Sequence, residues 1–282
     1  MKPPPFAYRR PDTLDELLAL LAEHGDDAAL LAGGQSLMPM LAPRLTAPAV
    51  IVHINRLPGL DGADLTGATW TFGALVRHAD ALAAVRARRG DHLLARALPH
   101  VAHPAIRNRG TVGGSLALAD PAAEWPACAL CLDAEIELIG PDGRRTVAAA
   151  DFFQGLYATA RRAEEIVGGL RFAAPTSTTR YAFHEVARRH GDYAAVGLAA
   201  RAETADGRIA ACRVVVFGAG ERPQRLADVE AAIAAGADGA RATEALGDSL
   251  AITPDATYGV DDKRRLAAAL VARATAEMGV PA

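Results

Sequence analysis

The sequence has few cysteines, few aromatic residues and no excess of positive charge. Only 3 of its 282 residues are cysteine, and aromatic residues make up 5%. Three thiols cannot build a disulfide framework, and three thiolates cannot complete a four-cysteine iron–sulfur site. The 30 basic and 33 acidic residues give a formal net charge of −3, so the chain lacks the positive potential that binds a phosphate backbone. These shortages exclude a disulfide-rich scaffold and argue against nucleic-acid binding.

Long apolar runs are also missing. No stretch approaches the roughly 18 uninterrupted apolar residues of a membrane-spanning helix, and the first residues, MKPPPF, lack the apolar stretch of a signal peptide. We therefore expect a cytoplasmic protein without a transmembrane segment. Apolar residues still make up 51% of the chain, which is enough for a sizeable core. A chain of 282 residues suits two domains or one large one.

Helix and strand signals alternate closely in the first part of the chain. Leucines at 14, 17, 18 and 21 predict a helix over residues 14–23. A second helix is predicted over residues 78–89, and strands are predicted over residues 28–32, 50–54 and 69–74. Residues 135–139 and 144–147 flank Pro-Asp-Gly and predict a β-hairpin. This mixture indicates an α/β or α+β fold.

The last third of the chain has a different pattern. Residues 173–179 are small, polar and proline-bearing, which predicts a boundary between domains of residues 1–176 and 177–282. Strands are predicted over 181–188, 193–203 and 208–217, followed by alanine-rich helices, the last near 263–278. Strands followed by helices indicate a small α+β domain.

Two glycine pairs are candidate anion-binding loops. Gly33-Gly34 follows an apolar strand and precedes Gln35-Ser36, and Gly113-Gly114 lies between Thr111 and Ser115. Glycines let the backbone turn sharply and expose successive N–H groups, which can hold phosphate oxygens. Each pair alone is also consistent with an ordinary tight turn. Two such loops could hold one pyrophosphate from both sides, and neither is followed by the Lys-Ser/Thr of a P-loop.

Two further motifs have simpler interpretations. Gly218-Ala219-Gly220 follows a predicted strand, but Pro223 stands where a Rossmann fingerprint has its third glycine. Cys128 and Cys131 form C-x-x-C, which could be a redox pair or half of a metal site. Their apolar neighbours and the absence of a second pair favour buried core cysteines.

Histidines and serines give no clear catalytic or metal site. His100 and His103 lie between Pro99 and Pro104, which break any helix that would align them, and no third ligand is evident. No G-x-S-x-G elbow supports a serine hydrolase. The segment R-R-H-G-D-Y-A at 188–194 is either a solvated connection or a loop that presents an aromatic ring to a ligand.

Several motifs occur in the order seen in a known family. They are L-A-G-G-Q-S-L (31–37), N-R-L-P-G-L (55–60), I-R-N-R-G-T-V-G-G-S-L (106–116), D-P-A-A-E-W-P-A (120–127) and R-R-H-G-D-Y-A (188–194). Over nearly its whole length the sequence resembles the FAD-binding medium subunit of the molybdenum hydroxylases. These form the xanthine dehydrogenase family, and the aerobic carbon monoxide dehydrogenase branch is the most similar. The resemblance implies an α+β fold, with a FAD-binding domain of the vanillyl-alcohol-oxidase (PCMH) type before a small CO dehydrogenase flavoprotein C-terminal domain.

The resemblance also implies a set of FAD-binding residues, with no catalytic or metal-binding residue in this chain. The two glycine loops would hold the pyrophosphate. Glu124, where the family more often has aspartate, would accept hydrogen bonds from a sugar or ribityl hydroxyl. Val167 and Tyr193 would flank the isoalloxazine, and His184 stands where some relatives have lysine. The full set is Leu31, Ala32, Gly33, Gly34, Gln35, Ser36, Leu37, Val101, Thr111, Gly113, Gly114, Ser115, Glu124, Val167, His184 and Tyr193.

The function implied by the resemblance is electron transfer within a larger enzyme. A large subunit would carry the molybdenum cofactor, and a small subunit would carry two [2Fe-2S] clusters. This chain would pass electrons through FAD to an external acceptor. The implied complex is a heterotrimer that pairs into a dimer, cytoplasmic or attached through the complex to the inner face of a membrane.

Two other functions stay open from the residues alone. One is a stand-alone FAD-dependent oxidoreductase of the same fold, which would turn over substrate without partner chains. The other is a nucleotide-binding or assembly module without a redox role, which would carry no flavin. The substrate of the complex (carbon monoxide, a purine, an N-heterocycle or an aldehyde) and the acceptor (quinone, NAD or oxygen) also stay open.

Overall fold

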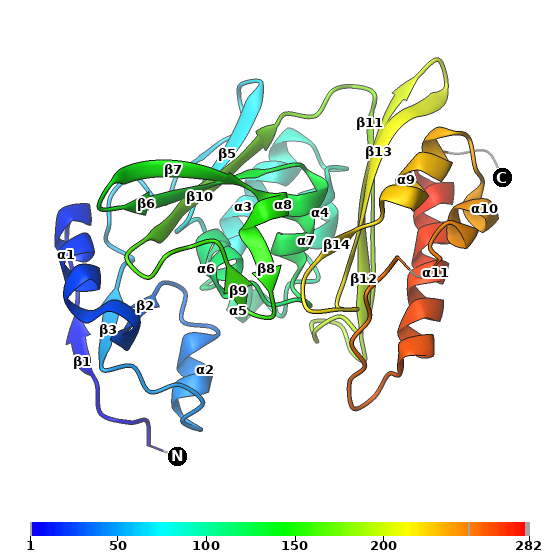
Figure 1. Ribbon diagram of the computed structural model, residues 1–282. Helices are drawn as coiled ribbons and strands as arrows, with labels where there is room; N and C mark the ends of the chain where they lie inside the picture. The colour runs from blue at the N-terminus through cyan, green and yellow to red at the C-terminus, as the bar shows by residue number, and fades with distance from the viewer. Residues whose placement is uncertain (1, 248, 280–282) are drawn as a thin grey trace.

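The computed structural model describes residues 2–247 and 249–279. Its first lobe is a small parallel sheet in the order β1-β3-β2, at the left of Figure 1. Leu17 and Leu21 on α1 are buried against this sheet, as the leucine spacing predicted. The elements are β1 (Ala7–Arg9), α1 (Leu14–His24), a 3₁₀ turn (Gly25–Asp27), β2 (Ala28–Leu31), α2 (Leu37–Leu41) and β3 (Val50–His53).

A five-stranded antiparallel sheet forms the centre of the molecule. Its order is β4-β5-β10-β6-β7, with β4 (Ala63–Asp64), β5 (Thr69–Gly73), β6 (Glu135–Gly140), β7 (Gly143–Ala148) and β10 (Ile166–Ala173). The hairpin of β6 and β7 was predicted from the sequence, whereas the central strand β10 was not. Two glycines interrupt β10, and a Cβ atom at Gly169 would lie 2.5 Å from the Phe72 carbonyl oxygen. The close packing of the strands therefore requires glycine here. Glycine is rare in strands, so the same residue weakens the sequence pattern that would predict one.

Short helices fill the space beside the central sheet (Figure 1). They are α3 (His78–Arg88), α4 (Leu93–Ala97), α5 (Pro104–Arg107), α6 (Val112–Leu118), α7 (Glu124–Cys131) and α8 (Ala149–Phe152), followed by the hairpin β8 (Phe153–Gly155) and β9 (Ala158–Thr159). Every residue of α7 is buried, including Cys128 and Cys131. Both thiols are free, and burial raises the pKa of each. Their interpretation as core cysteines is confirmed.

The last third of the chain is a second antiparallel sheet backed by helices. The sheet has the order β11-β12-β13-β14, and its alternate residues pack on α4 and α7 on one face and on α9 and α11 on the other (Figure 1). The elements are β11 (Thr179–Val186), β12 (Val196–Ala205), β13 (Arg208–Phe217), β14 (Gln224–Arg225), α9 (Ala227–Ala234), α10 (Gly239–Glu244) and α11 (Val260–Glu277). Strand β12 begins at Val196 rather than at Tyr193, which lies in the preceding loop.

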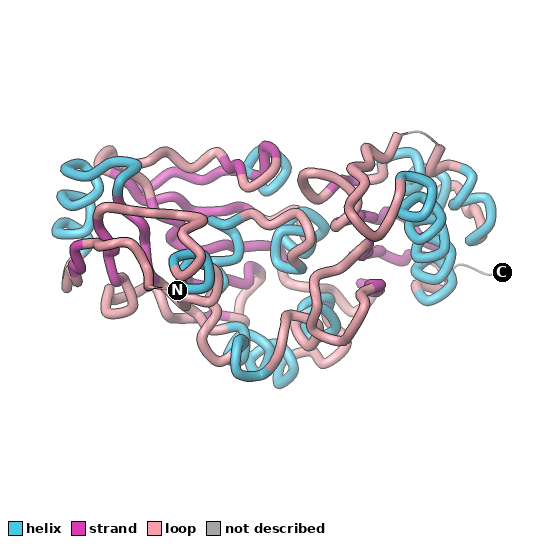
Figure 2. The backbone as a smooth tube through the Cα atoms, turned by 90° about the horizontal axis from the view of Figure 1, so that it is seen from below, coloured by secondary structure: helices cyan, strands magenta, loops and turns pink. Residues whose placement is uncertain are grey.

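Contacts outside the sheets also join the C-terminal part to the rest. Arg89, which follows α3, donates hydrogen bonds to the carbonyl groups of Thr176, in the connecting segment, and Thr179, the first residue of β11. The N–H group of Gly218 donates to the Pro121 carbonyl oxygen at 2.8 Å. The Gly-Ala-Gly motif therefore takes part in a contact between the two parts of the chain. The Rossmann fingerprint that it partly matches has no counterpart in this fold. Figure 2 shows the resulting molecule as an elongated body.

Candidate functional site

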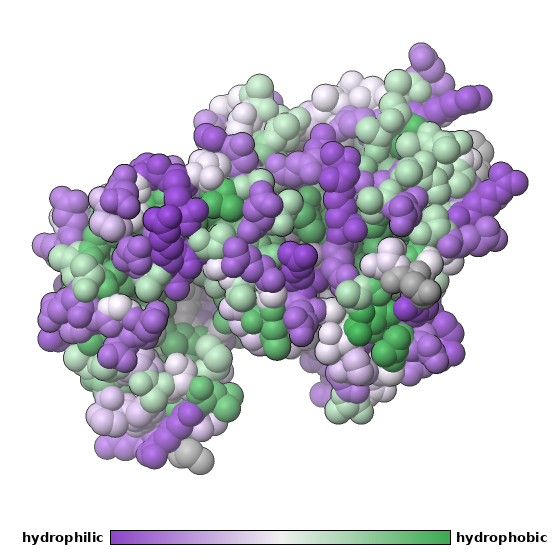
Figure 3. Space-filling view, in the orientation of Figure 1, coloured by the Kyte–Doolittle hydropathy of each residue, from purple (hydrophilic) through white to green (hydrophobic). Residues whose placement is uncertain are grey.

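A cavity of about 550 Å³ lies between the first lobe, α6 and the loop before β12. The surface is hollowed between this lobe and the rest of the molecule (Figure 3). Fourteen of the sixteen residues implied by the sequence resemblance line this one cavity, and only Leu31 and His184 do not. The fold therefore brings together segments that are spread over more than half of the chain.

The first glycine loop, residues 32–36, connects β2 to α2 and forms one wall of the cavity. Gly34 has φ +73°, a conformation that glycine adopts without the steric cost of a side chain. The Asn55 side chain holds the start of this loop, because its Nδ2 donates to the carbonyl oxygens of Leu31 and Ala32. Asn55 opens the N-R-L-P-G-L motif, and its amide oxygen is in turn held by Arg77.

The N–H groups of this first loop are free to bind a ligand. Its carbonyl groups accept hydrogen bonds from the Gln35 side chain and from the N–H groups of Met38 and Met40. Among the described residues, the N–H groups of residues 33–36 donate no hydrogen bond. Such a row of unpaired donors on a cavity wall is the arrangement that binds phosphate oxygens. The anion-binding interpretation of this loop therefore has a structural basis.

The second glycine loop has a different construction. The Gly113 N–H donates to the Ala74 carbonyl oxygen at 2.8 Å, and the Gly114 N–H donates to Thr111 Oγ1 at 3.1 Å. A Cβ atom on Gly113 would lie 2.5 Å from Cβ of Ala74. The idea that this pair exposes its N–H groups is therefore wrong: its glycines allow α6 to pack closely on the end of β5.

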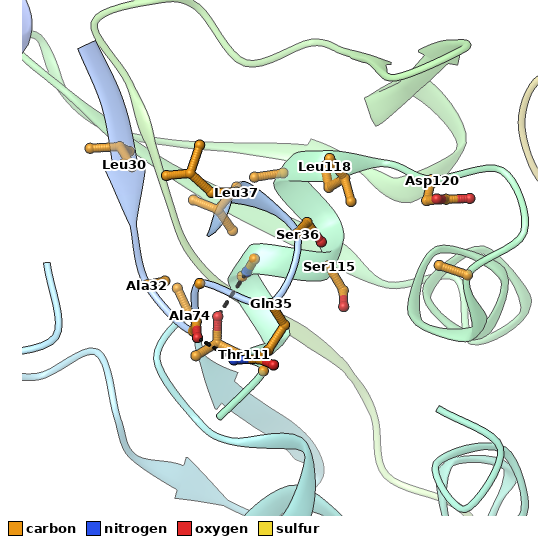
Figure 4. A pocket seen from close by; sticks show the side chains of 18 of the residues that line it. Leu30, Ala32, Gln35, Ser36, Leu37, Ala74, Thr111, Ser115, Leu118 and Asp120 are labelled. Carbon is orange, nitrogen blue, oxygen red and sulfur yellow. Dashed lines mark hydrogen bonds between the residues drawn. The ribbon is translucent and has the colours of Figure 1, made fainter. Parts of the chain in front are cut away.

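The two loops touch each other directly. A Cβ atom placed on Gly33 would lie 2.4 Å from the carbonyl oxygen of Arg109 and 2.8 Å from Cα of Gly110. Figure 4 shows Gln35 and Ser36 of the first loop in the same part of the cavity wall as Thr111 and Ser115 of the second. The expectation that both loops meet at one place is therefore correct in geometry, although only the first supplies free N–H donors.

A buried histidine that the sequence analysis did not identify lies beneath the second loop. His78 begins α3, is 4% exposed and lines the cavity. Its Nδ1 accepts a hydrogen bond from Trp125 Nε1 at 2.9 Å, and its Nε2 lies 3.4 Å from Ser115 Oγ. Burial, with a smaller effect of Arg107 and Arg77, lowers the pKa of His78 to about 4. The imidazole is therefore neutral, and its Nε2–H orients the Ser115 hydroxyl.

The opposite end of the cavity carries two buried carboxyl groups. Glu124 at the start of α7 is 9% exposed and Asp120 is 8% exposed. Burial raises the pKa of Glu124 to about 8, and the carboxylates of Glu185 and Asp120 contribute to the rise. Burial also raises the pKa of Asp120, whose Oδ2 accepts a hydrogen bond from the Tyr157 hydroxyl at 3.3 Å. Glu124 is protonated at neutral pH, so it can donate as well as accept a hydrogen bond.

An exposed loop forms part of the wall at this end of the cavity. Tyr193 is 68% exposed and lines the cavity together with Gly191. Gly191 has φ +87°, and a Cβ atom there would lie 2.8 Å from the His103 ring. The loop of residues 188–193 therefore packs on the segment after α4, and this contact presents Tyr193 at the opening.

Two residues of the implied set lie elsewhere. The Leu31 carbonyl group is held by Asn55, and the leucine packs beneath Gly34. His184 Nε2 lies 2.7 Å from Glu277 Oε2 at the end of α11, on the face of β11 that turns away from the cavity. We therefore remove His184 from the candidate site. Asp120, His78 and Asn55 were missed as site residues, because their roles depend on partners distant in the sequence.

The described residues contain no helix that is long and apolar enough to cross a membrane, and they offer no cluster of three or more histidine, cysteine or acidic residues placed to hold a metal ion.

Two family models account for most of the chain. Residues 4–175 match the FAD binding domain in molybdopterin dehydrogenase, and residues 181–278 match the CO dehydrogenase flavoprotein C-terminal domain. The first match alone covers more than half of the sequence. FAD is therefore the cofactor of the family to which this domain belongs.

Known proteins of this family resemble the chain along most of its length. It is 36% identical to the caffeine dehydrogenase subunit beta of Pseudomonas sp. strain CBB1, over 98% of this chain and 95% of that one. It is 39% identical to the nicotine 6-hydroxylase medium subunit of Paenarthrobacter nicotinovorans, over 82% and 80% respectively. A structure of carbon monoxide dehydrogenase from Hydrogenophaga pseudoflava superposes with a TM-score of 0.94 at 34% identity, covering 99% of this chain and 98% of that chain. This chain belongs to the FAD-binding medium subunits of the molybdenum hydroxylases.

Proposed function

We propose that FAD binds in the 550 Å³ cavity with its diphosphate against the first glycine loop. The observation that carries this proposal is the row of N–H groups at residues 33–36, which are unpaired among the described residues and belong to the wall of a cavity of a size typical for cofactor sites. The donors are fixed by Asn55 and by the contact of Gly33 with the second loop. They therefore need little rearrangement when an anion binds.

The two ends of the cavity suit different parts of the cofactor. The carboxyl groups of Glu124 and Asp120 would repel a diphosphate when ionised, but they can bind hydroxyl or N–H groups. Glu124 holds its proton at neutral pH because burial raises its pKa to about 8. Val167 and Tyr193 line the cavity and can pack on a planar ring. FAD supplies the ability to accept and donate electrons when it is bound.

We further propose the place of this chain in a complex. Its relatives are medium subunits of multi-subunit molybdenum enzymes. In a heterotrimer, FAD in this chain would take electrons from the iron–sulfur clusters of a small subunit and pass them to an external acceptor. The molybdenum cofactor would lie in a large subunit. Pairing of two heterotrimers and attachment of the complex to the inner face of a membrane stay predictions.

The names of the relatives suggest which subunit selects the substrate. They refer to nicotine, caffeine and carbon monoxide, which share little chemistry, although the chains that carry these names are all similar to this one. We propose that another subunit determines the substrate, and that this chain serves the common electron-transfer step.

Two measurements on the natively purified protein test this function. Acid precipitation should release about one FAD per chain into the supernatant, and mass spectrometry of the native complex should detect the two partner chains. Flavin that stays with the precipitate would contradict non-covalent binding, and a colourless protein would contradict the FAD site. Substrate oxidation by the isolated chain at the rate of the complex would favour the stand-alone oxidoreductase.

A further inference from the structure

We propose that Glu124, Glu185 and His100 form a proton path between the cofactor cavity and solvent. Glu124 lies in the cavity wall, Glu185 lies on β11, and His100 follows α4. This inference rests on the proposed function, because the path serves FAD bound in the cavity. No residue of the path is needed to hold the two glycine loops.

The outer step of the path is a direct contact between His100 and Glu185. His100 Nδ1 lies 3.0 Å from Glu185 Oε1, and the side chains are 32% and 4% exposed, respectively. The histidine is thus open to water, whereas the carboxyl group is almost completely enclosed. A buried carboxyl group with a single partner at the surface is in contact with solvent mainly through that partner.

The second oxygen of the Glu185 carboxyl group is the one that we assign to the inner step. Among the described residues, Glu185 Oε2 is buried without a hydrogen bond. Leaving a buried carboxylate oxygen unpaired costs free energy, and such an atom is often explained by a role in proton transfer or by a bound water. The carboxylate of Glu185 raises the pKa of Glu124, so the two groups interact electrostatically. A proton on Glu124, or a bridging water, would satisfy this oxygen.

The segment that carries His100 also forms part of the cavity wall. Val101 and Ala102 line the cavity, and Arg107 Nη1 donates to both of their carbonyl groups and to that of Pro99. The histidine is thereby held within a few residues of the cavity. Its ring also packs against Phe183, which precedes Glu185 by two positions on β11.

Several charged and titratable groups lie near the two ends of the path. Asp120 and Arg107 act on Glu124 with opposite effects on its pKa. Cys128, one turn along α7, keeps its proton because burial raises its pKa. On the outer side, the ring of His190 lies 5.7 Å from that of His100. Of these groups, only His190 is a second imidazole that could exchange protons with His100 and with water.

The chemistry balances without an additional reactant. Reduction of FAD takes up two electrons and protons to balance their charge. In the complex, the electrons come from the iron–sulfur clusters of a partner, which carry no protons. Glu124, which holds a proton at neutral pH, would first release it into the cavity. It would then regain a proton from His100 Nδ1 through Glu185, while His100 takes up a proton from water at its other nitrogen. Reoxidation of FAD reverses each transfer.

Strand β11 provides a matched control beside the path. His184 and Glu277 form a second histidine–glutamate pair, 2.7 Å apart, and His184 directly precedes Glu185 in the sequence. Neither residue lines the cavity. Substitution of this pair changes the charge of the same region without touching the path.

The test follows protons and electrons separately in the full chain loaded with FAD. The protein is mixed anaerobically in weak buffer with reduced methyl viologen, which donates electrons without releasing protons. Flavin bleaching and the absorbance of a pH indicator are recorded together. In the wild type we expect proton uptake to keep pace with bleaching. In Glu185→Gln and in His100→Gln, proton uptake should lag at least about tenfold, a lower bound beside the roughly 10²–10⁴-fold contribution of positioned acid–base groups. His184→Gln and Glu277→Gln should behave as the wild type, and imidazole should restore proton uptake in His100→Gly.

The outcomes separate this inference from the proposed function. If the wild-type chain binds no FAD, the proposed function fails before the path is tested. If FAD is bound and proton uptake keeps pace with bleaching in both Glu185→Gln and His100→Gln, the path is wrong and the FAD site stands. If Glu185→Gln does not fold, His100→Gln and its rescue by imidazole decide the question, because that side chain is partly exposed.

Discussion

The two glycine pairs look alike in the sequence but have different roles in the structure. In the first, the N–H groups of residues 33–36 make no hydrogen bonds among the described residues, and all four residues line the cavity. In the second, the N–H group of Gly113 donates to the Ala74 carbonyl oxygen, and that of Gly114 donates to the Thr111 hydroxyl. One loop is therefore a set of donors, and the other is a packing element that holds the wall behind it.

This difference shows what a glycine pair can and cannot indicate. A Gly-Gly sequence predicts that the backbone approaches something closely. It does not predict whether the neighbour is a ligand or another part of the chain. Gly33 approaches Arg109 and Gly110, while Gly113 approaches Ala74. The donors are free only where the chain offers no carbonyl group to pair with them.

Gly113→Ala should have the largest effect on stability. The new Cβ atom would lie 2.5 Å from Ala74 Cβ and 2.9 Å from its Cα, and backbone cannot move aside as a side chain can. Overpacking of this kind costs about 1–3 kcal/mol. Thermal unfolding of the FAD-free protein should show a clear loss of stability. An unchanged unfolding temperature would mean that the second loop is not a packing element.

Gly34→Ala should act mainly on FAD binding. The residue has φ +73°, and its Cβ atom would meet a flexible leucine side chain at 3.1 Å. The left-handed conformation costs a non-glycine residue about 1–2 kcal/mol, and relief of this strain would turn the N–H groups away from the cavity. We expect FAD affinity, measured by titration, to fall about tenfold, or about 1.4 kcal/mol. Unchanged affinity would place the diphosphate on another wall.

Glu124→Gln extends the comparison to the acidic end of the cavity. The folded protein keeps the Glu124 proton up to about pH 8, whereas its ordinary pKa is 4.5. The folded state therefore binds more protons between these values, and the free energy of unfolding falls as pH rises through the interval. Chemical denaturation of the FAD-free variant between pH 5 and 9 should show a shallower fall than the wild type. Identical slopes would mean that Glu124 is ionised in the folded protein.

Tyr193→Ala should have the smallest effect on the fold. The side chain is 68% exposed, and exposed substitutions usually change stability by less than about 0.5 kcal/mol. If the ring packs on FAD, the contact contributes roughly 0.5–1.5 kcal/mol beyond area burial. FAD should therefore stay bound, with an altered visible spectrum and an altered rate of reoxidation. A spectrum and rate equal to those of the wild type would place the ring away from the flavin.

Local patterns in the sequence were sufficient to predict much of the fold. The leucine stripe of α1 and the hairpin of β6 and β7 carry their signals within a few residues. Strand β10 escaped prediction, because its glycines are needed for contacts with strands far away in the sequence. The start of β12 was also misplaced, because the 188–193 loop is set by its packing on His103.

The same reasoning separates the predictable from the unpredictable parts of the site. The resemblance carried by the ordered motifs implied sixteen residues, and fourteen of them line the cavity. They could not show that the Gly113 N–H is paired with Ala74, or that His184 faces Glu277. Both outcomes depend on residues that only the tertiary fold brings together.

A crystal structure of the chain with bound FAD tests the central claim most directly. We predict that diphosphate oxygens lie within hydrogen-bonding distance, about 2.7–3.2 Å, of the N–H groups of residues 33–36, and that the Gly113 N–H remains bonded to Ala74. A diphosphate bound to the N–H groups of residues 113–115, or FAD outside this cavity, would contradict the account.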